Sequence, residues 1–104
     1  MMERIDKLKG MLATNPGDSF LQHALALEYI KQGDDAEARK LFEHLLQTNP
    51  GYVGSYYHLG KLLERIGDIN TALKIYENGM KEAQKAGEQQ AYGEMRGAWE
   101  ELSF

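Results

Sequence analysis

The sequence repeats itself at an offset of 34 residues. The turn Asn15–Gly17 returns as Asn49–Gly51, and the pair Gly33-Asp34 returns as Gly67-Asp68. The other identities in this register are Leu25 with Leu59, Ala38 with Ala72, Lys40 with Lys74, and Glu43 with Glu77. The matches follow one another in the order turn, apolar face, turn, apolar face. A fixed period of this length is typical of stacked helix–turn–helix units, which form interaction surfaces far more often than active sites.

The repeated pattern resembles the tetratricopeptide repeat (TPR) family residue by residue. In that family the first helix of each repeat carries a large aromatic residue, then Leu-Gly or Leu-Ala, and then Tyr. The second helix carries Ala, Phe or Tyr, and Ala, and a Pro closes the repeat. At these positions the first copy has Gln22, Leu25, Ala26, Tyr29, Ala38, Phe42, Leu45 and Pro50. The second copy has Tyr56, Leu59, Gly60, Leu63, Ala72, Tyr76 and Gly79.

The chain departs from this pattern at Gln22 (aromatic position), Leu63 (Tyr position) and Gln84 (closing Pro position). Without a proline at Gln84, the last helix of the second repeat is predicted to run past its usual end. The resemblance implies an all-α solenoid of about six antiparallel helices in a right-handed stack. We expect a single domain over residues 1–104, with repeats at residues 15–48 and 49–84.

Turn chemistry places the helices along the chain. Pro16 and Pro50 prevent a helix from continuing, Asp18 can cap the helix that follows it, and Gly33 suits a helix C-terminus. The predicted helices cover residues 2–14, 19–31, 35–47, 52–65, 69–85 and 88–102. We interpret the helix at 2–14 as an N-terminal cap and the helix at 88–102 as a C-terminal cap.

Apolar periodicity predicts which side chains are buried. We expect four large residues to be almost fully buried, namely Leu25, Phe42, Leu59 and Tyr76. Small residues are expected where helices cross closely, at Ala26, Gly60, Ala38, Ala72 and Gly79. In the last predicted helix one face is apolar and is expected to point inward, with Tyr92, Met95, Trp99 and Leu102. The opposite face is expected to be solvent-facing, with Glu94, Glu100 and Glu101.

Composition excludes several classes of function. The chain has no Cys, so it has no disulfide, thiolate metal site or cysteine nucleophile. A net charge of −4 disfavours nucleic acid as a partner, and no apolar run is long enough to cross a membrane. No catalytic or phosphate-binding motif is present, so we expect a protein that is not an enzyme and needs no cofactor. The first residues carry charges every few positions and lack the apolar core of a secretory signal, so we expect a cytoplasmic location. A metal site built from His44, His58 and a carboxylate is a minor alternative.

The resemblance implies that function lies on the concave face lined by the first helices of the repeats. The exposed positions there are Phe20, His23, Leu27, Ile30, Lys31, Tyr57, Lys61, Glu64 and Arg65, with Ala91, Met95 and Ala98 of the last helix near the same register. The three cations among them predict a basic cluster beside an apolar strip, and thus an acidic or amphipathic partner peptide. The inner positions lack the Lys and Asn arrangement that some TPR proteins use to bind chaperone C-termini. In an alternative reading, Leu27 and Ile30 merely pack against a neighbouring helix.

Two classes of function fit this sequence. The first is an adaptor that binds a partner peptide or protein in the groove. The second is a self-assembling scaffold, in which the terminal helices build a homodimer or an end-to-end stack. Two repeats are fewer than the three that such proteins usually need, so either the flanking helices or a second subunit must supply the missing burial.

Overall fold

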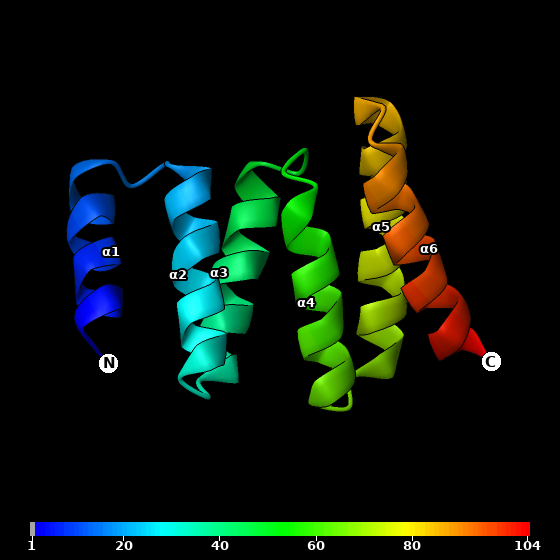
Figure 1. Cartoon of the computed structure of the whole chain (residues 1–104), viewed down its shortest axis with the longest axis horizontal. Helices are drawn as coiled ribbons and strands as arrows, with labels where there is room; N and C mark the ends of the chain where they lie inside the picture. The colour runs from blue at the N-terminus through cyan, green and yellow to red at the C-terminus, as the bar shows by residue number, and fades with distance from the viewer. Residues whose placement is uncertain (1) are drawn as a thin grey trace. The chain divides into compact units, whose positions relative to one another are not determined.

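A computed structural model describes residues 2–104, in which all regular secondary structure is α-helical (Figure 1). The helices are α1 (Met2–Thr14), α2 (Ser19–Lys31), α3 (Asp35–Thr48), α4 (Gly54–Arg65), α5 (Ile69–Ala86) and α6 (Gln89–Ser103). The all-α, TPR-type fold predicted from the repeat is therefore confirmed. The chain forms two compact units, one with α1–α3 that ends at Asn49 and one with α4–α6 that begins at Pro50. That the whole chain is a single domain stays a prediction.

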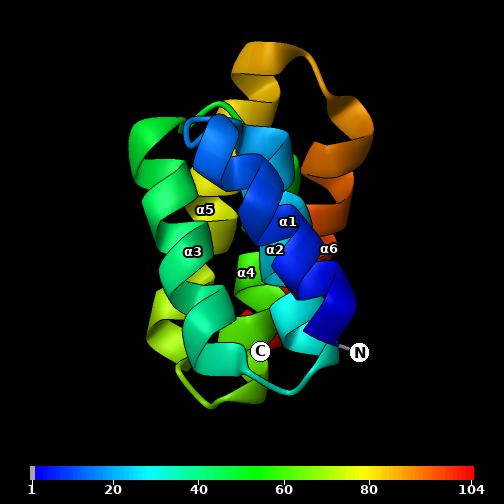
Figure 2. The same cartoon turned by 90° about the vertical axis from the view of Figure 1, so that its left-hand side faces the viewer.

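In the first unit, α1 packs along α2, and α2 packs against α3 (Figure 1, Figure 2). Ile5 and Leu8 of α1 are buried with Leu25 of α2. Beside this apolar contact, Arg4 reaches the buried Glu28 of α2, with 3.0 Å between Nε and Oε2. Because an unpaired carboxylate is costly to bury, this pair ties α1 to α2 at a defined position.

Aspartate caps begin three of the helices. Asp18, Asp34 and Asp68 each accept a hydrogen bond from the backbone N–H three residues later, at the first turns of α2, α3 and α5. The helix predicted from residue 52 begins instead at Gly54. Tyr52 occupies the position of Asp18 in the second copy and cannot cap in this way. The chain therefore enters α4 through a tighter turn, in which Ser55 N–H donates to the Tyr52 carbonyl.

In the second unit, α5 packs against both α4 and α6, and α6 also contacts α4 (Figure 1, Figure 2). A Cβ atom on Gly60 of α4 would lie 2.6 Å from Cζ of Tyr76, which is fully buried on α5. A Cβ atom on Gly79 of α5 would lie 2.6 Å from Cβ of Tyr56 on α4 and would also meet the sulfur of Met95 on α6. These two glycines let three helices approach closely, at the positions that the sequence predicted.

The predicted core is also confirmed, because Leu25, Phe42, Leu59 and Tyr76 are at most 5% exposed. As the missing proline predicted, α5 is longer than α3, with 18 residues against 14. Its last turns extend beyond α4 in Figure 1.

We expect the substitution Ala72→Leu to destabilise the protein by about 1–3 kcal/mol, because Ala72 is completely buried and a larger side chain would force the helices apart. Ala36→Leu, at an exposed position of α3, is the control and should change stability by less than about 0.5 kcal/mol. Urea unfolding of both variants measures the difference. Equal stabilities of the two variants would show that the repeat register is wrong.

Candidate functional site

A groove of about 470 Å³ lies between α4 and α6 of the second unit. Its lining consists of Tyr57, Lys61, Gly93, Glu94, Gly97, Ala98, Glu100 and Glu101. The α4 side thus includes two of the residues that the sequence predicted for a binding surface, Tyr57 and Lys61. We call this the α4–α6 groove.

The α4 side of the groove rests on the buried core. The ring of Tyr57 lies 6.5 Å, centroid to centroid, from the ring of Tyr76, and Tyr76 occupies the space that Gly60 leaves open. Lys61 places its Nζ 5.7 Å from the centre of the Tyr57 ring, in a cation–π contact. The same Nζ lies 3.7 Å from Oε2 of Glu64. The structure therefore brings together three of the predicted site residues, Tyr57, Lys61 and Glu64.

Glu64 also joins the groove to the core, since the Tyr76 hydroxyl donates a short hydrogen bond to its carboxylate. Burial and, secondly, this hydrogen bond raise the pKa of Tyr76 far above its ordinary value. Tyr76 is therefore a neutral donor throughout the physiological pH range, and it holds the Glu64 side chain in place beside Lys61.

On the α6 side of the groove, the expected polar face is confirmed, because Glu94 and Glu101 are exposed and Glu100 is half-buried. The sequence did not predict that these three glutamates line a groove beside α4. Met95 was expected near the groove, but it is 1% exposed and packs at Gly79. The helical periodicity correctly divided α6 into an apolar and a polar face. It did not reveal that α4 lies beside the polar face, because that depends on how α6 packs on α5.

The charge of the α4–α6 groove is opposite in sign to the basic cluster expected on the first helices of the repeats, which includes Lys31 of the first unit and stays a prediction. The lining contains one lysine and three glutamates. Lys61 is already paired with Glu64, and Arg65 is exposed but does not line the groove. The register placed Lys61 and Arg65 near each other on α4 and could not include the carboxylates that α6 contributes.

In the first unit, the predicted site residues follow one side of α2 at helical spacing. Phe20 is 67% exposed. Lys31 pairs with Glu28 of its own helix, with 3.7 Å between Nζ and Oε2. His23 makes an edge-to-face contact with Phe42 of α3, with ring centroids 5.7 Å apart. This pair corresponds in the repeat to Tyr57 and Tyr76. The remaining two predicted residues, Leu27 and Ile30, are half-buried.

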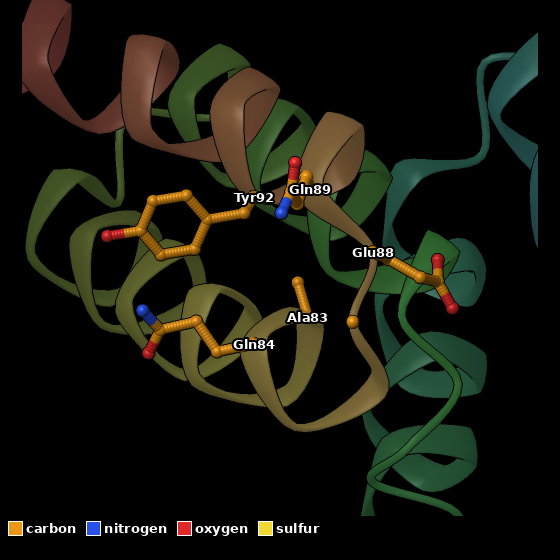
Figure 3. Close-up of a pocket in the computed structure, with 6 residues that line it drawn as sticks. Ala83, Gln84, Glu88, Gln89 and Tyr92 are labelled. Atoms are coloured by element: carbon orange, nitrogen blue, oxygen red, sulfur yellow. The ribbon is translucent and has the colours of Figure 1, made fainter.

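A second pocket, of about 380 Å³, lies where α5 turns into α6 (Figure 3). Its lining residues are Ala83, Gln84, Gly87, Glu88, Gln89 and Tyr92. Tyr92 and Gln84 extend on the same side of the pocket, whereas Glu88 points away from it (Figure 3). The sequence analysis did not predict this pocket. The missing closing proline at Gln84 was the available signal, because the pocket is formed partly by the extra turn of α5.

Within residues 2–104, no group of three or more His, Asp or Glu side chains is placed to hold a metal ion. No helix in this range is long and apolar enough to cross a membrane.

Paired antiparallel helices, small residues at their crossings and a groove beside the first helix of a pair together define a helical-repeat protein. Residues 29–93, more than half of the chain, match the family model of the tetratricopeptide repeat. The chain belongs to the tetratricopeptide repeat family.

Several known proteins are similar to this chain in sequence or in fold. A TPR repeat-containing protein of Pseudomonas aeruginosa is 30% identical over 91 residues, which cover 88% of this chain and 87% of the relative. The crystal structure of a TPR domain protein from Salinibacter ruber has 40% identity and a TM-score of 0.80, and the match covers 83% of this chain and 97% of that one. The solution structure of a Bordetella parapertussis protein has 27% identity and a TM-score of 0.81, and the match covers 95% and 86% of the two chains.

We expect Tyr76→Phe to lower the free energy of unfolding by about 0.5–1.5 kcal/mol, because it removes a hydrogen bond while the partly exposed Glu64 can be hydrated instead. Phe42 occupies the matching position of the first repeat, so the aromatic ring itself is tolerated. A double-mutant cycle with Glu64→Ala measures the interaction. If the two substitutions are additive, the hydroxyl and the carboxylate do not interact.

We expect the protein to lose stability as the pH falls below about 6.5, partly through His58 of α4. Burial lowers the pKa of His58 in the folded state, so between the two pKa values the unfolded chain binds a proton that the folded chain does not. This contribution is complete above the unfolded pKa and decreases as the pH falls toward the folded pKa.

Urea unfolding near about pH 7.5 and about pH 5.5 tests this expectation. His58→Gln should reduce the difference in stability between the two conditions. His44→Gln, at an exposed position of α3, should leave it as in the parent. An unchanged pH dependence in His58→Gln would assign the acid sensitivity to other groups.

Proposed function

We propose that this chain binds a partner protein or peptide through the α4–α6 groove and through the exposed side of α2. TPR proteins are generally protein–protein interaction modules, and the family is typically non-enzymatic. The observation that carries the proposal is the half-buried Tyr57, which forms part of the groove lining and rests on the Tyr76 ring. An aromatic side chain held in place by a core residue loses little conformational freedom when a partner binds, and such residues contribute strongly to binding energy.

Each unit offers its own set of proposed contacts. In the second unit they are Tyr57, Lys61, Glu64 and Arg65, and in the first unit they are Phe20, His23, Leu27, Ile30 and Lys31. Phe20 is the most exposed aromatic residue of α2, so packing in the core does not account for an aromatic side chain at this position. Large exposed apolar side chains next to polar ones are a common feature of binding surfaces.

Affinity capture from an extract of the source organism, followed by quantitative mass spectrometry, tests this proposal. Proteins enriched by the parent should be strongly depleted with Tyr57→Ala, because the groove loses its aromatic anchor. Phe20→Ala should also deplete them. Ile69→Ala, an exposed apolar position at the start of α5, is the control and should leave the enrichment unchanged. Circular dichroism establishes that every variant is folded.

Retention of the same partners by Tyr57→Ala and Phe20→Ala would place the binding surface elsewhere. If the enriched protein is the chain itself, and sedimentation shows a concentration-dependent dimer, self-assembly becomes the function. In that case the exposed side of α6 is the surface to test next.

A further inference from the structure

We infer that the α4–α6 groove selects a partner segment that carries positive charge, that is, one rich in lysine or arginine. This inference rests on the proposed function, because it specifies the partner of the same groove. It departs from the acidic partner that the sequence register favoured.

The charges that line the groove are predominantly negative. Glu94, Glu100 and Glu101 come from α6, and Lys61 from α4 is the single cation of the lining. One lysine against three glutamates leaves two net negative charges in the groove. An acidic segment entering this space would bring its carboxylates next to like charges, which costs several kcal/mol when they lie close together.

The lysine of the groove does not compensate the glutamates of α6. Its Nζ lies above the Tyr57 ring and 3.7 Å from Glu64, which is outside the groove lining. Of the three glutamates, Glu100 pairs with Arg96 on its own helix, with 3.1 Å between Nε and Oε2. Within residues 2–104, Glu101 makes no hydrogen bond or ion pair, so its carboxylate is available to a partner.

The shape of the groove suits long cationic side chains. Gly93 and Gly97 lie one helical turn apart on α6, and the space that a Cβ atom would occupy is open at both. At these two positions the α6 wall is bare backbone, and a partner segment can approach it closely. A lysine or arginine stem can lie along this wall while its charged end reaches a carboxylate. The Tyr57 ring, on the opposite wall, already holds one cation above its face and has the chemistry to hold another.

Synthetic peptides of equal length provide the test. One is an alanine- and leucine-based peptide with lysine at every fourth position, and its two counterparts carry glutamine or glutamate instead. We expect the lysine peptide to bind at least about tenfold more tightly than the glutamate peptide by calorimetry. Its affinity should decrease as salt is added. In nitrogen-15 NMR spectra it should shift the backbone signals of Gly93, Glu94, Gly97 and Tyr57.

Matched variants separate the groove from the overall negative charge of the protein. Glu94→Gln combined with Glu101→Gln should weaken binding of the lysine peptide by about tenfold. The control combines Glu43→Gln and Glu3→Gln, two exposed glutamates of the first unit, and makes the same change in net charge. It should weaken binding only slightly. Thermal melts establish that both variants are folded.

Several results would overturn the inference. Equal losses in the two double variants would mean that the peptide senses only net charge. Equal or tighter binding of the glutamate peptide in the groove would reverse the assigned partner charge, while the proposed groove function would stand. If the lysine peptide does not bind but Tyr57→Ala loses the natural partner, the assigned positive charge of the partner is wrong, while the proposed groove function stands. If Tyr57→Ala keeps that partner, the proposed function itself fails.

Discussion

The second unit depends on the close contact between Gly60 of α4 and the ring of Tyr76 on α5. Because Gly60 has no side chain, the ring lies directly against the α4 backbone and is fully buried. This position brings the Tyr76 hydroxyl to Glu64 and the Tyr76 ring next to the ring of Tyr57. Glu64 and Tyr57 in turn hold Lys61 at the margin of the α4–α6 groove. Gly60, which allows α4 and α5 to pack closely, thus determines how Tyr57, Lys61 and Glu64 are arranged on the surface.

The two repeats use different side chains for the same hydrogen bond. In the second repeat, the Tyr56 hydroxyl donates to the carbonyl of Pro50 at 2.6 Å. In the first repeat, Gln22 stands at the matching position, and its side-chain amide donates to the carbonyl of Pro16 at 2.8 Å. The departure from an aromatic residue therefore keeps the link between helix and turn. It leaves Gln22 Oε1 buried without a hydrogen-bond partner, a cost that tyrosine does not have because it carries one polar atom.

The helix α6 completes the core and also supplies half of the groove. Its apolar side buries Met95 at Gly79 of α5, which fixes how α6 is rotated about its own axis. Once that rotation is fixed, the helical period of 3.6 residues turns Glu94, Gly97 and Glu101 toward α4. The contact of Met95 with Gly79 therefore has two effects: it stabilises the second unit, and it directs the glutamates of α6 into the groove.

The sequence by itself determined the helices, the Asp18 cap and the core, because these depend on local turn chemistry and on apolar spacing that a 34-residue period displays twice. It also identified Tyr57 and Lys61 as surface residues of a first helix, since the register gives the face of each helix. It failed at the start of α4, where Tyr52 replaces a capping aspartate, and it did not place the polar face of α6 beside α4. Only the tertiary structure decided the sign of the groove. Charges on helices that are distant in sequence come together through packing, and no periodicity within a single helix contains that information.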